Sequence, residues 1–410
     1  MQILLLAHFA GSPYHGMVFG HYFLAREWVK MGHEVTIVAS AYSHVRAKQP
    51  KQKKQLSHEN IDGINYVWVP AKAYKPKSAF QRIKNILGFA FKLILYQSRF
   101  PIPDLVICAS HHPFPIYTAH HLSRKYRAPL VFEVRDLWPL TLIELGGLSK
   151  INPLIWMMQR AEDYAYHHAF RVVSVLPASK DYMISRGMKP EKFVYIPNGI
   201  HIDENSTPLP LPPSHIEKLD LLRNQVEFII GYAGKTGLSN ALPTLLDAIH
   251  LLDDKQIAVA FLGSGADSDN LRQKATELGL DKRVIFLDPV NKNQVQDFLQ
   301  RIDAAYAGAI KSPLYRFGMS LTKLNDFMLA GKPIIYAIEA PGNIVEESGA
   351  GISCPAESPE ELSKAILKMK VLTPEERAEM GAKGRDWIIK NRDYNKLAAD
   401  FLNAVFENSP

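Results

Sequence analysis

The sequence predicts an α/β protein with two doubly wound domains, each a parallel sheet covered by helices on both faces. Its 410 residues exceed one ordinary domain and suit two of about 200 residues each. In both halves, apolar runs of strand length alternate with amphipathic stretches of helix length, as in the strand–helix–strand units of a parallel sheet. The series restarts after a Pro-rich run at 208–213. We therefore expect a first domain over residues 1–205 and a second over residues 206–385.

Composition narrows the class of protein further. Hydrophobic residues make up 47% of the chain and charged residues 22%, as in a globular protein rather than a disordered or fibrous one. The N-terminus starts with an apolar, strand-like run without a basic leader, and no run of 18 apolar residues occurs. We therefore expect neither a signal peptide nor a membrane span. The two cysteines lie in separate halves, which fits a reducing cytoplasm.

The first half begins with a strand–helix–strand unit. Apolar runs at 2–7 and 33–39 flank an amphipathic helix over 20–31, and such a crossover places the two strands in parallel. The loop between the first strand and the helix, 9–17, contains no Gly-x-Gly-x-x-Gly, so the indication of a dinucleotide site is weak. A polar stretch at 42–59 interrupts the pattern. Further strands are expected at 64–69, 104–110, 129–134 and 171–176 and from 193 onward, with a helix over 153–169.

A basic segment interleaved with aromatic residues follows the run at 64–69. Its basic residues are Lys72, Lys75, Lys77, Arg82, Lys84, Lys92 and Arg99. From about Ser78 it predicts a helix whose apolar stripe comprises Ile83, Ile86, Leu87, Ala90, Phe91 and Ile94. Two interpretations stay open, an ordinary helix packed on the sheet with solvated lysines, or a surface whose basic face approaches anionic lipid headgroups.

Charge is distributed unevenly between the halves. Residues 1–200 have a balance of +13 and the remaining residues a balance of −6. An anionic partner is therefore expected at the first half only. The sequence contains no recognition-helix or RNA-binding signature, so nucleic acid is not expected to be that partner.

Polar side chains follow two strands of the first half, where α/β proteins place their ligands. His111 and His112 follow the strand at 104–110, and neighbouring residues of a strand end do not share one face, so a metal site is not expected there. Either histidine could contact substrate. Arg135 and Asp136 follow the strand at 129–134. Arginine does not release its proton in proteins, which argues against a role of Arg135 as a general base. The alternative to any role in the reaction is a structural one, in which Arg135 and Asp136 form an ion pair that anchors the loop.

The second half contains a stretch, 315–333, with the features of a phosphate site. A Gly-containing loop with Gly318, Met319 and Ser320 leads into a helix over 321–329, which ends at Gly331, and a strand follows at 333–337. Loop amides and a helix N-terminus favour an anion, and Lys323 in the first turn adds a positive charge. One turn later, Asp326 could accept hydrogen bonds from two ribose hydroxyls. The alternative is an ordinary loop–helix–strand unit with solvated charges.

The remaining strands of the second half are expected at 227–233, 257–262, 284–288 and 303–307. The first of them leads into the loop 234–240, which contains Gly234 and Lys235 and precedes a helix over 243–252. Lys235 is therefore a second candidate for binding phosphate, and an ordinary solvated loop lysine is the alternative.

The stretch 315–333 resembles the donor-site segment of retaining glycosyltransferases of family four, which have the GT-B fold. The run Asp-Phe-Met-Leu-Ala-Gly-Lys-Pro at 326–333 matches the second half of their Glu-x7-Glu pattern, with Asp326 in the place of the ribose-binding Glu. Gly318 stands where the first Glu is expected. The form Phe-Gly-x-Ser-x-x-Lys-x-x-Asp-x-Met at 317–328 resembles the fucosaminyltransferase-like branch of bacterial surface-polysaccharide synthesis. Arg-Asp-Leu-Trp-Pro at 135–139 and Pro-Asn-Gly at 197–199 are further points of resemblance, Arg135 replacing the usual His.

The resemblance implies a site built from both halves. It implies two Rossmann-like domains that face a central cleft, with a C-terminal helix over 386–410 that crosses back to the first domain. The donor would be bound by Gly234, Lys235, Gly318, Met319, Ser320, Lys323 and Asp326. Arg135 and Asp136 would be catalytic, with Arg135 stabilising charge on the leaving phosphate. Gly11, Ser12, His111 and His112 would line the acceptor side.

The activity implied is transfer, with retention, of a sugar from a UDP-sugar to a lipid-linked saccharide, in O-antigen or capsule assembly. The sugar would be an N-acetylated amino or deoxyamino hexose, and neither a metal nor a cofactor is expected. The protein would be cytoplasmic and peripheral at the inner face of the membrane, with its basic first domain toward anionic lipid. The alternatives are a UDP-sugar epimerase of the same fold and a non-catalytic partner subunit that binds a sugar nucleotide.

Overall fold

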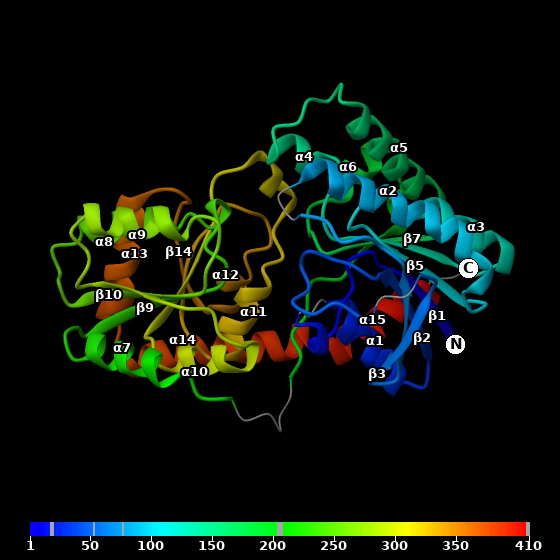
Figure 1. Cartoon of the computed structure of the whole chain (residues 1–410). Helices are drawn as coiled ribbons and strands as arrows, with labels where there is room; N and C mark the ends of the chain where they lie inside the picture. Colours follow the sequence, from blue (N-terminus) through cyan, green and yellow to red (C-terminus); the bar gives the residue numbers. More distant parts are fainter. Residues whose placement is uncertain (17–19, 52–53, 76–77, 203–207, 407–410) are drawn as a thin grey trace. The chain divides into compact units, whose positions relative to one another are not determined.

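The computed structural model describes residues 1–16, 20–51, 54–75, 78–202 and 208–406 (Figure 1). Met17 of the predicted loop, Lys77 of the basic segment and the predicted boundary at 205/206 lie outside these ranges. Contacts divide the chain into a first unit, residues 1–201, 317–320 and 394–410, and a second unit, residues 202–316 and 321–393. The predicted start of the tail at 386 falls inside a helix, because that helix continues to Arg392 and the backbone becomes extended only at Asp393.

The first unit is built on an eight-stranded sheet in the order β3-β4-β2-β1-β5-β6-β7-β8. The strands are β1 (Gln2–Leu6), β2 (Glu34–Ser40), β3 (Ser57–Ile61), β4 (Ile64–Val69), β5 (Leu105–Ala109), β6 (Leu130–Val134), β7 (Arg171–Ser174) and β8 (Phe193–Tyr195). All neighbours are parallel except β3 and β4. The order reverses at β1 and β5, so their carboxyl ends form the topological switch point where doubly wound sheets bind ligands.

Helices cover both faces of this sheet (Figure 1). They are α1 (Gly20–Lys30), α2 (Ala79–Tyr96), α3 (Ile116–Tyr126), α4 (Leu140–Glu144), α5 (Pro153–His168), α6 (Lys180–Ser185) and α15 (Tyr394–Phe406). Short 3₁₀ turns occur at η1 (Pro13–His15), η2 (Gln97–Arg99) and η3 (Pro190–Lys192). α1 packs against α15, whereas α3 packs against α2 and α5.

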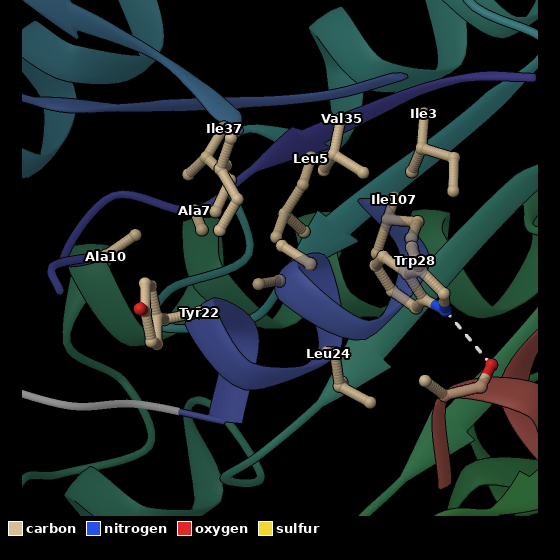
Figure 2. Packing of buried hydrophobic residues seen from close by; sticks show 14 of the residues in the cluster. Ile3, Leu5, Ala7, Ala10, Tyr22, Leu24, Trp28, Val35, Ile37 and Ile107 are labelled. Atoms are coloured by element: carbon tan, nitrogen blue, oxygen red, sulfur yellow. Dashed lines mark hydrogen bonds between the residues drawn. The ribbon is translucent and has the colours of Figure 1, made fainter. Parts of the chain in front are cut away.

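The core beneath α1 fixes the C-terminal helix to the first unit. Figure 2 shows Trp28 of α1 against apolar side chains of the sheet, among them Ile3 and Ile107. Its indole Nε1 donates to the carbonyl of Ala398 in α15 at 3.0 Å, and its ring lies edge-on to Phe401. A buried indole needs such an acceptor, so this one contact joins two segments that are 370 residues apart.

The first unit contains one strand that was not predicted, and one expectation for it is wrong. The polar stretch 42–59, which interrupts the pattern, leads into β3 (Ser57–Ile61), an edge strand joined to β4 by Asp62 and Gly63, both with positive φ. Asp-Gly is a hairpin signal, but a polar edge strand has no apolar alternation to reveal it. In α2, the buried residues are Phe89 and Leu93, whereas Leu87, Phe91 and Ile94 of the predicted stripe are exposed.

The second unit has a six-stranded parallel sheet in the order β11-β10-β9-β12-β13-β14. Its strands are β9 (Phe228–Ala233), β10 (Ile257–Leu262), β11 (Val284–Leu287), β12 (Ala304–Gly308), β13 (Ile334–Ala337) and β14 (Gly351–Ser353). Its helices are α7 (Pro213–Arg223), α8 (Leu242–Leu251), α9 (Ser268–Glu277), α10 (Val295–Gln300), α11 (Thr322–Leu329), α12 (Ile344–Ser348), α13 (Pro359–Val371) and α14 (Pro374–Arg392), with 3₁₀ turns η4 (Leu238–Asn240), η5 (Lys292–Gln294) and η6 (Pro313–Phe317). The predicted fold class, two doubly wound parallel-sheet domains, is confirmed.

α7 is one of the helices of the second unit that the sequence analysis did not predict. α7 begins at Pro213, the last residue of the Pro-rich run, where proline suits the first helical turn. Only His215, Leu219 and Leu222 are buried on it, so its apolar stripe is too sparse to be recognised.

Candidate functional site

The second unit places the predicted phosphate-binding loop at its switch point. Gly234 directly follows β9, and β9 lies beside β12, where the strand order reverses. Gly234 has φ +148, and a Cβ on Gly263 would lie 2.2 Å from the carbonyl oxygen of Gly234. The loops after β9 and β10 therefore approach each other backbone to backbone, which only glycine permits.

Lys323 in the first turn of α11 reaches this loop. Its Nζ donates to Tyr232 Oη at 3.0 Å and to Asn240 Oδ1, and it lies 4.6 Å from the centre of the Tyr232 ring. Tyr232 and Asn240 also donate to the carbonyl of Lys235, at 2.7 and 3.1 Å. The structure thus brings Lys323 and the backbone of the 234–240 loop together, whereas the side chain of Lys235 is exposed.

The Lys323 ammonium lacks a carboxylate among these contacts, and burial lowers its pKa to about 8. A group with this pKa is mostly charged at pH 7 and mostly neutral at pH 9. We expect the affinity for UDP to fall as the pH rises through about 8, by up to about tenfold per pH unit. Calorimetric titrations from pH 6.5 to 9.5 check this. Lys323→Arg, which stays charged, should remove the dependence, and an equal fall in this variant would contradict the assignment.

Asp326 lies one turn further along α11 and is buried. It forms an ion pair with Lys292 of η5, a residue that the sequence analysis did not single out because the two are far apart in the chain. Burial raises the pKa of Asp326, and the charge of Lys292 opposes that rise. The carboxylate is therefore held in place beside a cation whose own side chain is largely exposed.

Asp326→Ala tests the predicted ribose contact. We expect the affinity for UDP to weaken by about 1.5–3 kcal/mol, as for a charge-assisted hydrogen bond, while the fold persists because Lys292 remains solvated. Calorimetry with UDP measures this loss. The matched control is Lys292→Gln, which keeps the carboxylate. Unchanged affinity in Asp326→Ala would remove this residue from the site.

The other predicted donor residues belong to the first unit. Gly318 has φ +93, as its place in the loop requires, and Phe317–Ser320 is counted with the first unit. Ser320 Oγ accepts from the amide of Asn198 at 3.1 Å, and its carbonyl accepts from Asn198 Nδ2 at 3.0 Å. The structure thus assigns Gly318, Met319 and Ser320 to one unit and Gly234, Lys235, Lys323 and Asp326 to the other.

The N-terminus of α11 has no side-chain cap that would compete with an anion. Its N-cap, Leu321, has no polar side chain that could accept from the first-turn amides. First-turn amides without a side-chain cap, and Lys323 in the same turn, favour a negatively charged ligand there.

In the first unit, Arg135 follows β6 and is held by two partners. Its Nη1 donates to Glu133 Oε1 at 2.9 Å, and its Nη2 donates to Asn198 Oδ1. The predicted alternative, an Arg135–Asp136 pair that anchors the loop, is therefore wrong. The physical reason is that Glu133 and Asn198 occupy the guanidinium, while the charge of Arg135 only opposes the rise that burial causes in the pKa of Asp136.

Glu133 is the partner of Arg135 that the sequence analysis did not assign. It is buried, and its second oxygen binds His21 Nε2 of α1. Although burial acts to raise its pKa, the charges of His21 and Arg135 lower the pKa of Glu133 to about 2. A carboxylate in an otherwise apolar strand indicates a buried ion pair in the sequence itself, because a buried charge needs partners.

The two predicted histidines differ in accessibility. His112 is buried, and its Nε2 shares a hydrogen bond with His8 Nδ1 at 2.6 Å, while His8 Nε2 lies 2.8 Å from Asn85 Oδ1. Burial lowers the pKa of His112 to about 3 and the pKa values of His8 and His111 well below the usual range. These rings are therefore neutral at pH 7. His111 is half-buried as a residue, but both of its ring nitrogens are buried, as is Nδ1 of His112.

Gly11 and Ser12 are both buried and have partners within the first unit. The carbonyl of Gly11 accepts from Tyr66 Oη at 3.0 Å, and Ser12 Oγ shares a hydrogen bond of 2.8 Å with His15 Nδ1. Both residues thus shape the loop after β1. Among the residues that the structure describes, no group of three or more His, Cys, Asp and Glu side chains could hold a metal ion.

Comparisons with known proteins match both halves of the chain. The family model Glycosyltransferase Family 4 matches residues 15–204, and Glycosyl transferases group 1 matches residues 216–387. A curated relative, "Probable glycosyltransferase WbjE" of Pseudomonas aeruginosa, is 24% identical over 266 residues, which are 64% of this chain and 65% of the relative. The match thus spans slightly less than two thirds of that relative's length.

Solved structures share the fold along the whole chain. Sucrose-phosphate synthase from Thermosynechococcus elongatus superposes with a TM-score of 0.74 at 14% identity and covers 100% of both chains. Anabaena Alr3699/HepE in complex with UDP and glucose gives a TM-score of 0.66 at 18% identity and covers 99% of this chain and 100% of its own. Such low identities establish a common fold and nothing finer.

Proposed function

Because the chain is built as a GT-B glycosyltransferase, with a Glycosyltransferase Family 4 domain followed by a Glycosyl transferases group 1 domain, we propose that it transfers a sugar from a UDP-sugar to an acceptor. The observation that carries the proposal is the partly buried Lys323 in the first turn of α11, whose ammonium is tied to the loop at the switch point of the second sheet. A cation, the amides of an uncapped helix N-terminus and a glycine-containing loop suit a diphosphate.

The nucleotide part of the donor would bind to the second unit. Lys323 would hold a phosphate oxygen, with Lys235 able to reach it from the exposed rim of the loop, and Asp326 would accept from the ribose. The relative Alr3699/HepE was solved with UDP and with UDP-glucose, which supports uridine as the base.

Arg135 would act at the reacting centre, with Asp136 beside it. A guanidinium fixed by Glu133 and Asn198 can stabilise the negative charge that develops on the leaving diphosphate, and it needs no reorganisation to do so. We propose retention at the anomeric carbon without a metal ion, as the resemblance of 315–333 to retaining enzymes implies.

The sugar and the acceptor are proposed from the same resemblance. The pattern at 317–328 favours an N-acetylated amino or deoxyamino hexose, and the relative named WbjE is also called a probable glycosyltransferase. The acceptor would be a lipid-linked saccharide of O-antigen or capsule type, met at the inner face of the membrane by the basic first half. Among the described residues, no helix combines the length and apolar character that crossing a membrane requires.

Direct binding of UDP, GDP, ADP and NAD to the purified chain tests the proposal. We expect calorimetry to show a preference for UDP, after which a panel of UDP-sugars with lipid acceptors follows. A preference for NAD, or binding of none of the four, would sink the donor-site assignment.

A further inference from the structure

A cavity of about 440 Å³ lies in the first unit, between α2 and the segment that follows β4. Its lining includes Lys72, Lys84 and Lys92 together with the polar side chains of Tyr74, Gln81 and Asn85. None of the lining residues, all of which the structure describes, is Asp or Glu. Three ammonium groups around one cavity without a carboxylate favour an anionic ligand.

Lys92 shows that the cavity is short of negative charge. Its Nζ donates to the carbonyl of Pro70 at 2.6 Å. Burial, and then the charge of Lys72, lower the pKa of Lys92. A phosphate group in the cavity would offset that repulsion and would accept hydrogen bonds from all three lysines.

The same helix presents an apolar face to solvent. Phe80, Leu87, Phe91, Ile94 and Leu95 are 77%, 36%, 61%, 50% and 59% exposed. The first four are spaced by seven, four and three residues, which aligns them on one side of α2. Phe89 and Leu93, which are buried against the sheet side, lie on another face. This stripe is an exposed apolar surface beside a basic cavity.

We propose that this flank of α2 is a lipid-binding site, in which the cavity takes the phosphate of a lipid head group and the exposed stripe contacts the acyl region. Bulky apolar side chains next to lysines suit the boundary between head groups and acyl chains. A soluble phosphate would leave the stripe in water, and a nucleic acid would not need it. This proposal rests on the proposed function in one respect, because it takes the bound lipid to be the carrier of the acceptor saccharide.

The cavity is linked to the carboxyl edge of the first sheet. Asn85, one of its lining residues, contacts His8, which follows β1 at the switch point. A lipid phosphate bound here would therefore place the attached saccharide toward the edge where His111 and Arg135 lie.

Vesicle sedimentation tests the site without any sugar nucleotide, so its result is independent of UDP binding. Vesicles of phosphatidylcholine, with or without phosphatidylglycerol, are mixed with the full chain and three double variants. Lys72→Gln/Lys84→Gln removes two cavity charges, and Phe91→Ser/Ile94→Ser removes part of the stripe. Lys255→Gln/Lys282→Gln, at exposed lysines of the second unit, is the charge-matched control.

We expect the unchanged chain to bind the anionic vesicles more tightly than the neutral ones. The cavity variant should bind about 25-fold more weakly, at about fivefold per lysine, and the control should match the unchanged chain. The stripe variant should lose at least tenfold on both kinds of vesicle. Equal losses in the cavity variant and the control would overturn the cavity as the site, and full binding by the stripe variant would overturn the lipid contact.

Calorimetry with inorganic pyrophosphate separates a lipid from a free anion. If pyrophosphate binds to the unchanged chain and not to the cavity variant, while vesicles bind to neither, the cavity serves a soluble anion and the lipid assignment fails. Vesicle binding that depends on both the lysines and the stripe supports it. Each variant is first checked by thermal unfolding, and all the substituted side chains are exposed, so the fold should persist.

Discussion

Arg135→Ala is expected to lower kcat by about 100- to 1000-fold, the usual effect of removing one donor to a charged transition state. The affinity for UDP should change little, because Arg135 belongs to the first unit and the proposed nucleotide contacts of Lys323 and Asp326 to the second. Steady-state kinetics with a UDP-sugar and acceptor, together with UDP calorimetry, measure the two quantities separately. A large loss of UDP affinity at normal kcat would assign Arg135 to donor binding instead.

Arg135→Lys is the matched control for that result. It keeps the charge next to Glu133 but loses the planar fork that reaches Glu133 and Asn198 together. We expect partial activity, between those of the unchanged chain and Arg135→Ala. Thermal unfolding of both variants shows whether a loss of activity reflects unfolding, since Arg135→Ala leaves the buried Glu133 with His21 alone of its two ionic partners.

Lys323→Gln is expected to weaken UDP binding by about 10- to 150-fold, because it removes a charge-assisted hydrogen bond to phosphate of about 1.5–3 kcal/mol. The same substitution should raise the melting temperature at pH 7. The pKa of Lys323 in the folded chain, about 8, lies below that of a lysine in the unfolded chain. Protonation of Lys323 therefore destabilises the fold. That penalty is fully present below pH 8 and fades as the pH rises toward the unfolded-state value.

In Lys323→Gln the affinity for UDP should therefore fall while the melting temperature rises. Lys235→Gln is the control, because its side chain is exposed, and removal of its charge should leave the melting temperature unchanged. If Lys323→Gln binds UDP as well as the unchanged chain, the phosphate site does not include Lys323. If it also melts lower, the lysine is structural.

Local patterns predicted the parts of the site that depend on neighbours in the chain. The loop, helix and strand at 315–337 follow from Gly318, Gly331 and an apolar run, and α11 and β13 lie within the predicted limits. Each signal acts within one turn of helix, so the sequence displays it directly. Lys323 was singled out for the same reason.

Contacts between distant segments could not be read in this way. Lys292 pairs with Asp326 from 34 residues away, and Asn198 reaches Ser320 across 122 residues. No feature of the sequence near either residue of a pair indicates which residue is its partner. The exposed stripe of α2 shows a related limit, because apolar periodicity identifies a face but not whether protein covers it. Glu133 was visible as a charged residue in an apolar strand, but its partners His21 and Arg135 were not.

The attachment of α15 to Trp28 and the first sheet bears on how this chain could be recombined with its relatives. A chimera joined once, near residue 202, would take its last helix from the wrong parent, and a foreign helix would have to fill the space of Phe401 and Val405 beneath α1. Such a hybrid should express poorly. A hybrid with a second junction near residue 393, which returns residues 394–406 to the parent of the first unit, keeps that core intact. Donor specificity could then be exchanged by replacing only the segment between the two junctions, and not everything that follows the first junction.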